Sequence, residues 1–269
     1  MRKIARKIYP LLLLAAVSAL AAGCGKKKEE VDLRSVMTTA QETVEGESTS
    51  VSATLASAEE SQTETIPALA IQDTAFTQDK ITISYPKLSG MEDSAKESRI
   101  NALIAQNATA IAKAQGWGPD TEASIGYKIV SQSKSRIGIV YSGTKTDANG
   151  SANIFYTNTI DLNSGKDLGL SDFTDPYTMA GYVLSDDVIL SDAFASQSAA
   201  FMDTRKNNTL EEYTALFKDA DFPIVKPEDS NEGFPSSFSY EAGGDIFFSV
   251  PVSHDQGDYV VVKYSPDTK

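Results

Sequence analysis

Thiol and imidazole groups are almost absent from this chain of 269 residues, which has one cysteine and one histidine. A single cysteine cannot form an intramolecular disulfide, so the fold has to be stabilised by a hydrophobic core, and 41% of the residues are hydrophobic. With one histidine, a metal site would have to rely on carboxylates, which suit hard cations rather than zinc. We therefore predict that the protein uses no metal and no other cofactor.

Basic residues are scarce as well, since 24 Lys and Arg stand against 37 Asp and Glu, a formal charge of −13. No basic stripe with interleaved aromatic residues is present, so nucleic acid is not an expected partner. An acidic surface repels anionic polymers and attracts cations and basic proteins over a screened distance of ~10 Å or less. Among macromolecular partners, the composition therefore favours a basic protein.

No apolar run is long enough to span a membrane. The stretch Ile8–Ala22 has about fifteen residues, whereas a spanning helix needs ~20. A basic leader precedes it, and Leu20-Ala-Ala-Gly-Cys24 closes it. This order is typical of a bacterial lipoprotein signal peptide. We predict that residues 1–23 are removed and that Cys24 is lipidated, with palmitate among its acyl chains; the alternative is an ordinary cleaved signal with an incidental cysteine.

The predicted lipid defines where the protein works. Two acyl chains hold a protein stably on a membrane, whereas one chain binds reversibly. Cleavage would remove four basic residues and no acid, which leaves 20 basic and 37 acidic residues and a formal charge of −17. We expect the protein on the outer face of the bacterial cytoplasmic membrane, in contact with the membrane through the lipid on Cys24.

Aromatic residues are missing from residues 24–72, which follow the predicted cleavage site. This segment is rich in Ser, Thr, Glu and Ala and has no sustained apolar period, so it cannot bury enough surface to offset its ordering entropy. We interpret it as a disordered tether. A flexible chain of this length has an r.m.s. reach of roughly 35–40 Å, enough to lift a folded module off the lipid headgroups.

From Asp73 onward the pattern is that of regular secondary structure. Lys80–Pro86 alternates and predicts a strand that stops at the proline. Ser94-Ala-Lys-Glu97 predicts a capping box at the start of a helix, and Gly116 is a natural stop for it. Turn residues then separate three expected strands of an antiparallel meander, which are residues 123–133, 136–145 and 152–162.

The second half of the chain predicts helices followed by strands. Asp175-Pro176 should cap a helical region that contains Met179, Val183, Leu190 and Phe194, with a break at residues 185–187. A second capping box, Thr209-Leu-Glu-Glu212, begins another helix. Strands are expected at residues 238–240, 246–252 and 259–264. The order indicates an α+β fold, an antiparallel sheet packed with a few helices, with a first subdomain over 73–167 and a second over 168–269.

His254 is the first candidate for chemistry, in the polar loop Val252-Ser-His-Asp-Gln-Gly-Asp258. A hydrolytic triad would need Asp255 or Asp258 to orient His254 and a distant serine to attack, but no Gly-x-Ser-x-Gly elbow is present. A lone histidine in such a loop is more often a turn or surface residue. We therefore assign no catalytic residue and predict a binding surface that includes His254, Asp255, Asp258 and Tyr259.

Trp117, the only tryptophan, lies in Gln115-Gly-Trp-Gly-Pro119. It could belong to the same binding surface and stack on a sugar or fill a partner's pocket, and the plainer alternative is that it covers the end of the preceding helix. Asp161–Asp167 is faintly similar to a calcium loop but lacks the central Gly and the final Glu, so a hairpin turn explains it better. Gly243-Gly244 has no phosphate-loop context and indicates a hairpin turn.

Three segments together resemble a known kind of extracellular domain: Ile81–Pro86 with its helix, Asp161–Phe173, and Asp245–Tyr259. Over residues 73–265 they are similar to the paired domains of unknown function in RsiV anti-sigma factors and in the non-catalytic N-terminal region of PdaC deacetylases. The resemblance implies an α+β extracellular module, PdaC-like over 73–167 and RsiV-like over 168–269, which in RsiV senses lysozyme. The chain departs from both families, because it lacks a cytoplasmic anti-sigma segment with its spanning helix and the Asp-His-His metal site of a deacetylase.

These observations lead to one hypothesis and two alternatives. The hypothesis is a non-enzymatic, lipid-anchored binding module of a bacterial cell envelope, which recognises an envelope component such as peptidoglycan or a basic secreted protein such as a lysozyme. The first alternative is a cell-wall glycan hydrolase that uses two carboxylates, although no spacing in the sequence singles out a pair. The second is a structural accessory subunit of an envelope complex.

Overall fold

The computed structural model describes residues 69–224 and 233–266, which all fall within one compact unit, Thr63–Lys269. The predicted signal peptide, Cys24 and nearly all of the predicted tether lie outside the described residues. The first strand, β1 (Ala70–Gln78), begins inside the segment assigned to the tether, three residues before Asp73. None of the helices in the described part of the chain is long and apolar enough to cross a membrane.

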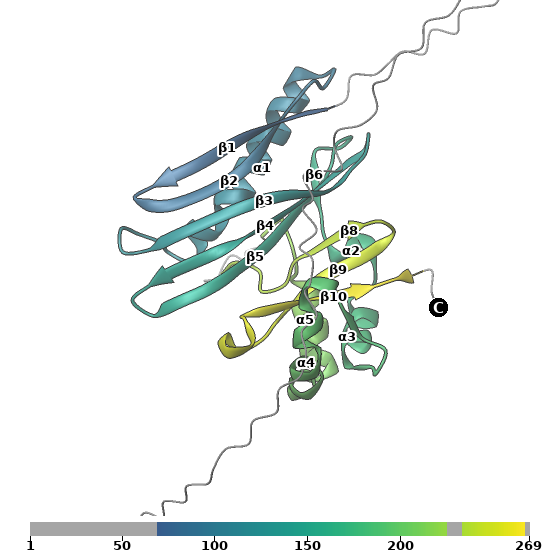
Figure 1. Cartoon of the computed structure of the whole chain (residues 1–269). Helices are drawn as coiled ribbons and strands as arrows, with labels where there is room; N and C mark the ends of the chain where they lie inside the picture. The colour runs from purple at the N-terminus through teal and green to yellow at the C-terminus, as the bar shows by residue number, and fades with distance from the viewer. Residues whose placement is uncertain (1–68, 225–232, 267–269) are drawn as a thin grey trace, which may run out of the picture. The chain divides into compact units, whose positions relative to one another are not determined.

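The first half of the described chain, residues 69–168, forms a six-stranded sheet in the order β1-β2-β3-β4-β5-β6 (Figure 1). All its neighbours pair antiparallel except β2 and β3, which pair parallel because the helix α1 (Ser94–Ala114) crosses over between them. The predicted meander of three long strands is confirmed. The other strands are β2 (Lys80–Ser89), β3 (Glu122–Gln132), β4 (Arg136–Asp147), β5 (Gly150–Asp161) and β6 (Lys166–Leu168).

Strand β2 runs through Pro86 to Ser89, so the expected stop at the proline was wrong. The proline is tolerated because the pairing of β2 with β3 ends at Ile83, and beyond it β2 pairs with β1 alone. Strand β5 is buried without interruption over residues 156–160. Tyr141 and Tyr156 are direct cross-strand partners, and their buried rings stack with centroids 4.6 Å apart.

Helix α1 was predicted correctly, but its N-terminal cap was not. The N-cap is Asp93, whose carboxylate accepts from the amides of Ala95 and Lys96, each at 2.9 Å. The Glu97 carboxylate accepts from the Met91 amide instead of the Ser94 amide. The predicted stop is confirmed, because Gly116 adopts φ +62° and the next amide bonds back to the Ala112 carbonyl, as in a Schellman motif.

The second half, residues 169–224 and 233–266, forms a four-stranded sheet in the order β7-β10-β9-β8 together with short helices. The helices are α2 (Leu170–Phe173), α3 (Pro176–Leu184), α4 (Ser198–Thr204) and α5 (Leu210–Lys218). The strands are β7 (Ile189–Leu190), β8 (Ser239–Ala242), β9 (Asp245–Pro251) and β10 (Tyr259–Tyr264). Three 3₁₀ turns complete it: η1 (Asp192–Gln197), η2 (Arg205–Asn207) and η3 (His254–Gln256).

Both predicted helix starts in this half are confirmed. Asp175 caps α3 by accepting from the Thr178 amide at 2.8 Å, and Pro176 takes the first helical position. Thr209 and Glu212 form the reciprocal capping box of α5. The helical region after Asp175 is shorter than expected, however: α3 ends at Leu184, Leu190 belongs to strand β7 and Phe194 to the 3₁₀ turn η1. The α+β fold class is as predicted.

The two sheets meet at a seam, which we define by Arg136 and Thr157 from the first sheet and Asp221, Ser239 and Glu241 from the second half. Asp221 is fully buried at its centre. Its carboxylate accepts from the Leu170 amide at 2.8 Å and from the Ser239 amide and hydroxyl, each at 2.6 Å. The Thr157 hydroxyl lies 3.3 Å from it and donates to the Ser239 carbonyl at 2.6 Å. One carboxylate thus ties β5, β8 and the start of α2 together.

Candidate functional site

The loop between β9 and β10 holds four of the residues predicted to bind a partner. The strand β9 ends at Pro251, and the turn η3 follows, closed by Gly257 at φ +98° and Asp258 at φ +72°. An aspartate tolerates this left-handed conformation better than most side chains. The Asp258 carboxylate contacts both His254 and the Asn153 amide. His254 and Asp255 lie in this turn, and Asp258 follows it.

His254 and Asp258 are in direct contact. The His254 Nδ1 lies 2.9 Å from Asp258 Oδ1, with 70% of the histidine side chain exposed against 21% of the aspartate. The other Asp258 oxygen accepts from the Asn153 amide of β5 at 2.7 Å. Asp258 therefore fastens the loop to the first sheet, and the exposed His254 stands outside that contact. No serine hydroxyl of the described residues bonds to His254, so the arrangement does not make a triad.

Asp255 and Tyr259 differ in their exposure. Asp255 is exposed, and the Ser253 hydroxyl holds its pKa below the usual range, with the Asp255 amide and the His254 charge adding to the effect. Tyr259 is half-buried: its ring stacks on Phe155 with centroids 4.9 Å apart, and burial raises the pKa of its hydroxyl. Tyr259 consequently anchors the loop, and His254 and Asp255 are the parts that a partner could reach.

Trp117 does not share this surface. Its side chain is 9% exposed and belongs to the hydrophobic core of the first sheet, next to α1. Its indole N–H donates to Gln115 Oε1 at 3.1 Å. Of the two alternatives for Trp117, its burial favours the plainer one, in which it covers the end of the helix. The five predicted surface residues do not converge on one cleft.

Two of the surface cavities lie beside the β9–β10 loop and beside the seam residues Arg136 and Glu241. One, of about 260 Å³, lies beside the β9–β10 loop and is lined by Thr204, Asn207, Ser253 and Gln256 over an apolar floor that includes Phe201. The other, of about 290 Å³, lies between the β3–β4 and β8–β9 turns. Both are slightly smaller than the ≈ 300–1,000 Å³ usual for small-molecule sites. Each is an open surface concavity between turns, with a lining that is partly polar and partly apolar.

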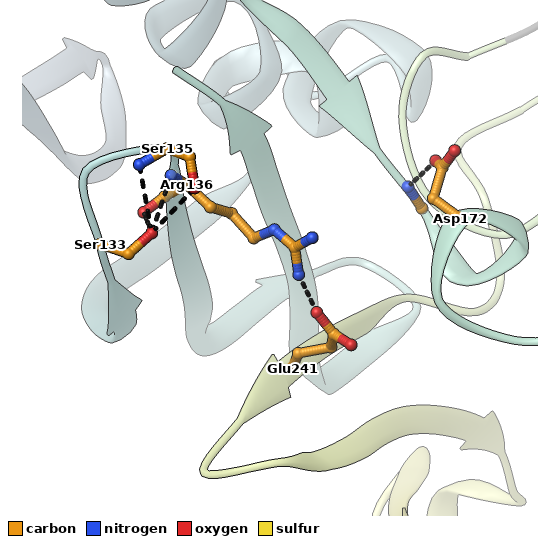
Figure 2. Close-up of polar contacts among 6 residues, drawn as sticks. Ser133, Ser135, Arg136, Asp172 and Glu241 are labelled. Atoms are coloured by element: carbon orange, nitrogen blue, oxygen red, sulfur yellow. Dashed lines mark hydrogen bonds and ion pairs between the residues drawn. The ribbon is translucent and has the colours of Figure 1, made fainter. Parts of the chain in front are cut away.

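Figure 2 shows polar contacts among residues that line the second cavity. The Arg136 guanidinium reaches from β4 to the Glu241 carboxylate on β8, and its charge also lies over the Phe173 ring at 5.4 Å. The Ser133 hydroxyl closes the β3–β4 turn by accepting from the amides of Ser135 and Arg136, at 3.3 and 3.1 Å. Glu241 is the only carboxylate that lines this cavity. Its polar groups are thus largely paired with one another.

The segment with a faint likeness to a calcium loop is a hairpin turn between β5 and β6. Asp161 accepts from the Asn163 amide at 2.8 Å and from the Ser164 hydroxyl at 2.9 Å, and Gly165 adopts φ +68°. Within residues 69–224 and 233–266, no three His, Cys, Asp or Glu side chains cluster so as to hold a metal ion. Gly243 and Gly244 likewise form the β8–β9 hairpin turn, both with positive φ, as predicted.

Charge is distributed very unevenly between the two halves, which the overall composition conceals. Residues 69–168 contain ten Asp or Glu and ten Lys or Arg, a formal charge of 0. The described residues of the second half contain fourteen Asp or Glu and four Lys or Arg, a formal charge of −10. Two of those four bases are already paired, since Arg205 bonds to Asp186 and Lys263 to Asp245. Counting charges over each half of the sequence would have found this signal.

The exposed charges of the second half follow the same bias. Two bases, Lys206 and Lys218, are exposed. The exposed acids are Asp172, Asp175, Asp186, Asp187, Asp192, Asp203, Glu211, Glu212, Asp219 and Asp255. Among the described residues, the large hydrophobic side chains left exposed are Tyr177 at 58% and Ile189 at 60%, and both lie in this half. Acidic surface and accessible apolar groups therefore occur together.

Comparison with known proteins gives a limited result. No protein-family model matches the chain, and no curated protein matches it. Among solved structures, it is similar to a member of the DUF3298 family from Bacteroides fragilis, with 12% identity and a TM-score of 0.38, over 75% of this chain and 92% of that one. A DUF3298 family protein from Pseudomonas aeruginosa is similar at 11% identity and a TM-score of 0.38, over 74% and 92%. Similarity at this level establishes neither a family nor a function.

Proposed function

We propose that this protein is a non-enzymatic, lipid-anchored module of the bacterial cell surface that binds a basic secreted protein through its acidic second half. The observation that carries the proposal is the separation of charge, 0 in the first half and −10 in the second. A fold does not require such an imbalance, because the first half folds with equal numbers of acidic and basic residues. A surface of one sign raises the rate at which an oppositely charged protein finds it.

The lipid anchor and the tether complete the proposal. A module fixed by the lipid on Cys24 to the outer face of the cytoplasmic membrane, at the end of a flexible segment, can search a layer some tens of ångströms deep. A lysozyme is the kind of partner that fits, since it is basic, secreted and active in that layer. The −10 charge also disfavours anionic wall polymers as the main ligand, because like charges repel.

The test uses the chain from Gly25 onward, which lacks the predicted signal peptide and lipid, and a lysozyme as the probe. Immobilised lysozyme should capture the protein at low salt. The association rate should fall steeply as ionic strength approaches 0.15 M, where the screening length is about 8 Å. Absence of salt-sensitive binding would remove this proposal. Capture by purified peptidoglycan at the same ionic strength, without lysozyme binding, would favour an envelope-glycan ligand instead, and turnover of that peptidoglycan would favour the hydrolase.

Matched charge variants place the binding in one half. Asp187, Asp203 and Glu211 are exposed, have no recorded side-chain bond, and can be changed together to Asn, Asn and Gln. The control changes three such acids of the first half, Glu92, Asp120 and Glu122, in the same way. Both triple variants lose three negative charges. The first should slow association with lysozyme severalfold and the second should not; equal effects would contradict a docking surface in the second half.

A further inference from the structure

The helices α3 and α5 cover one face of the second sheet and leave a common outer face. Their inward side chains, among them Val183, Tyr213 and Phe217, are buried with the strands, and the Phe217 ring lies 5.1 Å from the Phe248 ring of β9. The helices run antiparallel. At one end the Arg205 guanidinium, next to the start of α5, donates to the Val183 carbonyl near the end of α3 at 2.8 Å.

At the opposite end of the helix pair, the charges of Asp175 and Lys218 attract each other. The hydroxyl and amide of Thr178 hold the pKa of Asp175 below its usual range, and Lys218 at the end of α5 adds a smaller Coulombic contribution. The outward face of α3 therefore runs from Asp175 and Lys218 at one end to Asp186 and Asp187 at the other. No described element covers the residues in between, Tyr177, Thr178 and Gly181, which are all exposed.

Tyr177 is an exposed aromatic side chain at the start of α3. Its side chain is 58% exposed on the first turn of α3. No ring contact and no hydrogen bond of its hydroxyl is recorded within the described residues. Every other tyrosine of the second half is buried or half-buried. An exposed aromatic ring on a rigid helix buries a large area in a complex at a low cost in conformational entropy, which is why tyrosine is enriched among the residues that dominate interfaces.

Gly181 lies one turn further along, so it shares a helix face with Tyr177. Glycine in the interior of a helix is unfavourable compared with alanine. Nothing in the described fold requires it here, because a Cβ added at Gly181 would meet no atom within 4 Å and the position is exposed. Its backbone conformation is that of an ordinary helix. The glycine leaves a notch beside the tyrosine, where another chain can approach the helix closely.

We propose that the outward face of α3, with Tyr177 as its anchor and the notch at Gly181 beside it, is the surface on which a basic protein docks. The inference rests on the proposed function and adds the location of the contact. Charge complementarity selects the occupant: the exposed acids Asp175, Asp219, Asp186, Asp187 and Glu211 lie at the two ends of the helix pair, and Lys218 is the one exposed base of the pair. A central apolar anchor within a charged rim is the usual anatomy of such an interface.

Filling the notch is the sharpest test, because it adds bulk without changing charge. Gly181→Gln introduces a helix-favouring side chain into open space and should not destabilise the protein. Tyr177→Ala removes the anchor. The control, Ala102→Gln, adds a larger side chain at an exposed position of α1. With lysozyme as the probe, we expect Gly181→Gln and Tyr177→Ala each to weaken binding tenfold or more, mainly by faster dissociation, and Ala102→Gln to leave it unchanged.

The outcomes separate this inference from the proposed function. If lysozyme binds, and the acidic triple variant of the second half slows its association while Gly181→Gln and Tyr177→Ala bind as the native chain does, then the proposed function stands and this docking face is wrong. If the native chain does not bind lysozyme, both are lost. A melting temperature of Gly181→Gln below that of the native chain would show that the fold needs the glycine, and would overturn the assignment of the notch.

Discussion

The two halves of this module are built by the same means and differ in what they present to solvent. Each packs helix against a β-sheet around its own hydrophobic cluster, with helices capped by Asp or Thr side chains. The first half does so with ten acids and ten bases, the second with fourteen acids and four bases. Because the balanced half folds without an excess of one sign, the excess in the other half is not a requirement of this architecture, and the proposed binding rests on it.

The two halves also differ in the exposure of their tyrosines, although the seam joins them. The first half buries Tyr141 and Tyr156 in its core, whereas the second half exposes Tyr177. The halves are nonetheless joined tightly, since Phe222 and Phe238 from the second half pack in the cluster of the first sheet. A docking surface on one half is therefore supported by the packing of both. Three predictions follow from this contrast, beginning with the largest effect.

The largest effect concerns whether the halves unfold together. Phe248→Ala removes a fully buried ring from the core of the second half and should destabilise the protein by about 3–5 kcal/mol. Trp117, the lone tryptophan, reports from the core of the first half. Because the seam couples the halves, we expect the denaturant midpoint followed by Trp117 fluorescence to fall together with that followed by circular dichroism.

A matched variant makes this prediction decisive. Ile139→Ala removes a buried side chain from the first core, at a cost of about 2–5 kcal/mol, and both probes should again move together. If the fluorescence midpoint of Phe248→Ala stayed at the native value while the circular dichroism midpoint fell, the halves would be independent units. The second half would then have to be treated as a separate binding domain.

How far the sequence determined this picture depends on the range of each signal. Local patterns were sufficient for the caps at Asp175 and Thr209 and for the strands β3 to β5, since capping and turn residues act within a few positions. The N-cap of α1 was misplaced by one residue because Asp93 and Ser94 are both good caps and only the geometry selects one. The expected location of Trp117 was left open between a binding surface and the end of the helix, because only the tertiary contacts select one.

Long-range features could not be obtained in this way. Asp221 gathers donors from Leu170, Thr157 and Ser239, up to 64 residues away in the chain, and nothing in its local sequence indicates burial. The parallel pairing of β2 with β3 and the membership of Leu190 in a strand also depend on tertiary contacts. The charge of the second half, by contrast, was available from the sequence and needed only to be counted by region. Exposure at Tyr177 required the structure.

The second prediction concerns the pH dependence of the seam. Burial raises the pKa of Asp221 from 3.8 to about 6, and the hydrogen bonds from Ser239, Leu170 and Thr157 offset only part of that rise. The folded state therefore binds this proton more tightly than the unfolded state between pH 4 and pH 6. The contribution of Asp221 to the free energy of unfolding should be full below about pH 4 and decline on the order of 2 kcal/mol as the pH rises to about 6.

The measurement compares the native chain with Asp221→Asn, because the other carboxylates titrate equally in both. The amide cannot titrate, and it replaces one acceptor oxygen by a donor that faces backbone amides, which should destabilise the protein by about 1–3 kcal/mol. The stability difference between the two proteins should shrink from pH 4 to pH 6 and stay constant above it. A difference that grows with pH would mean that the pKa of Asp221 is lowered in the fold.

The last prediction contrasts a glycine from each half, and the change at Gly181 is the smallest effect that we expect. In β4 of the first half, a Cβ at Gly143 would lie 2.8 Å from the Ile125 Cα and closer still to the Ser124 carbonyl oxygen, so Gly143→Ala should be clearly destabilising. Gly181 meets no such obstacle, and Gly181→Ala should raise the free energy of unfolding by about 0.5–1 kcal/mol, measured by urea denaturation. A gain at Gly181 means that the native chain keeps a residue that weakens its own helix. Stability does not account for such a residue, whereas the proposed close approach of another chain to the helix does. The sign of this small effect therefore tests whether Gly181 belongs to a docking surface.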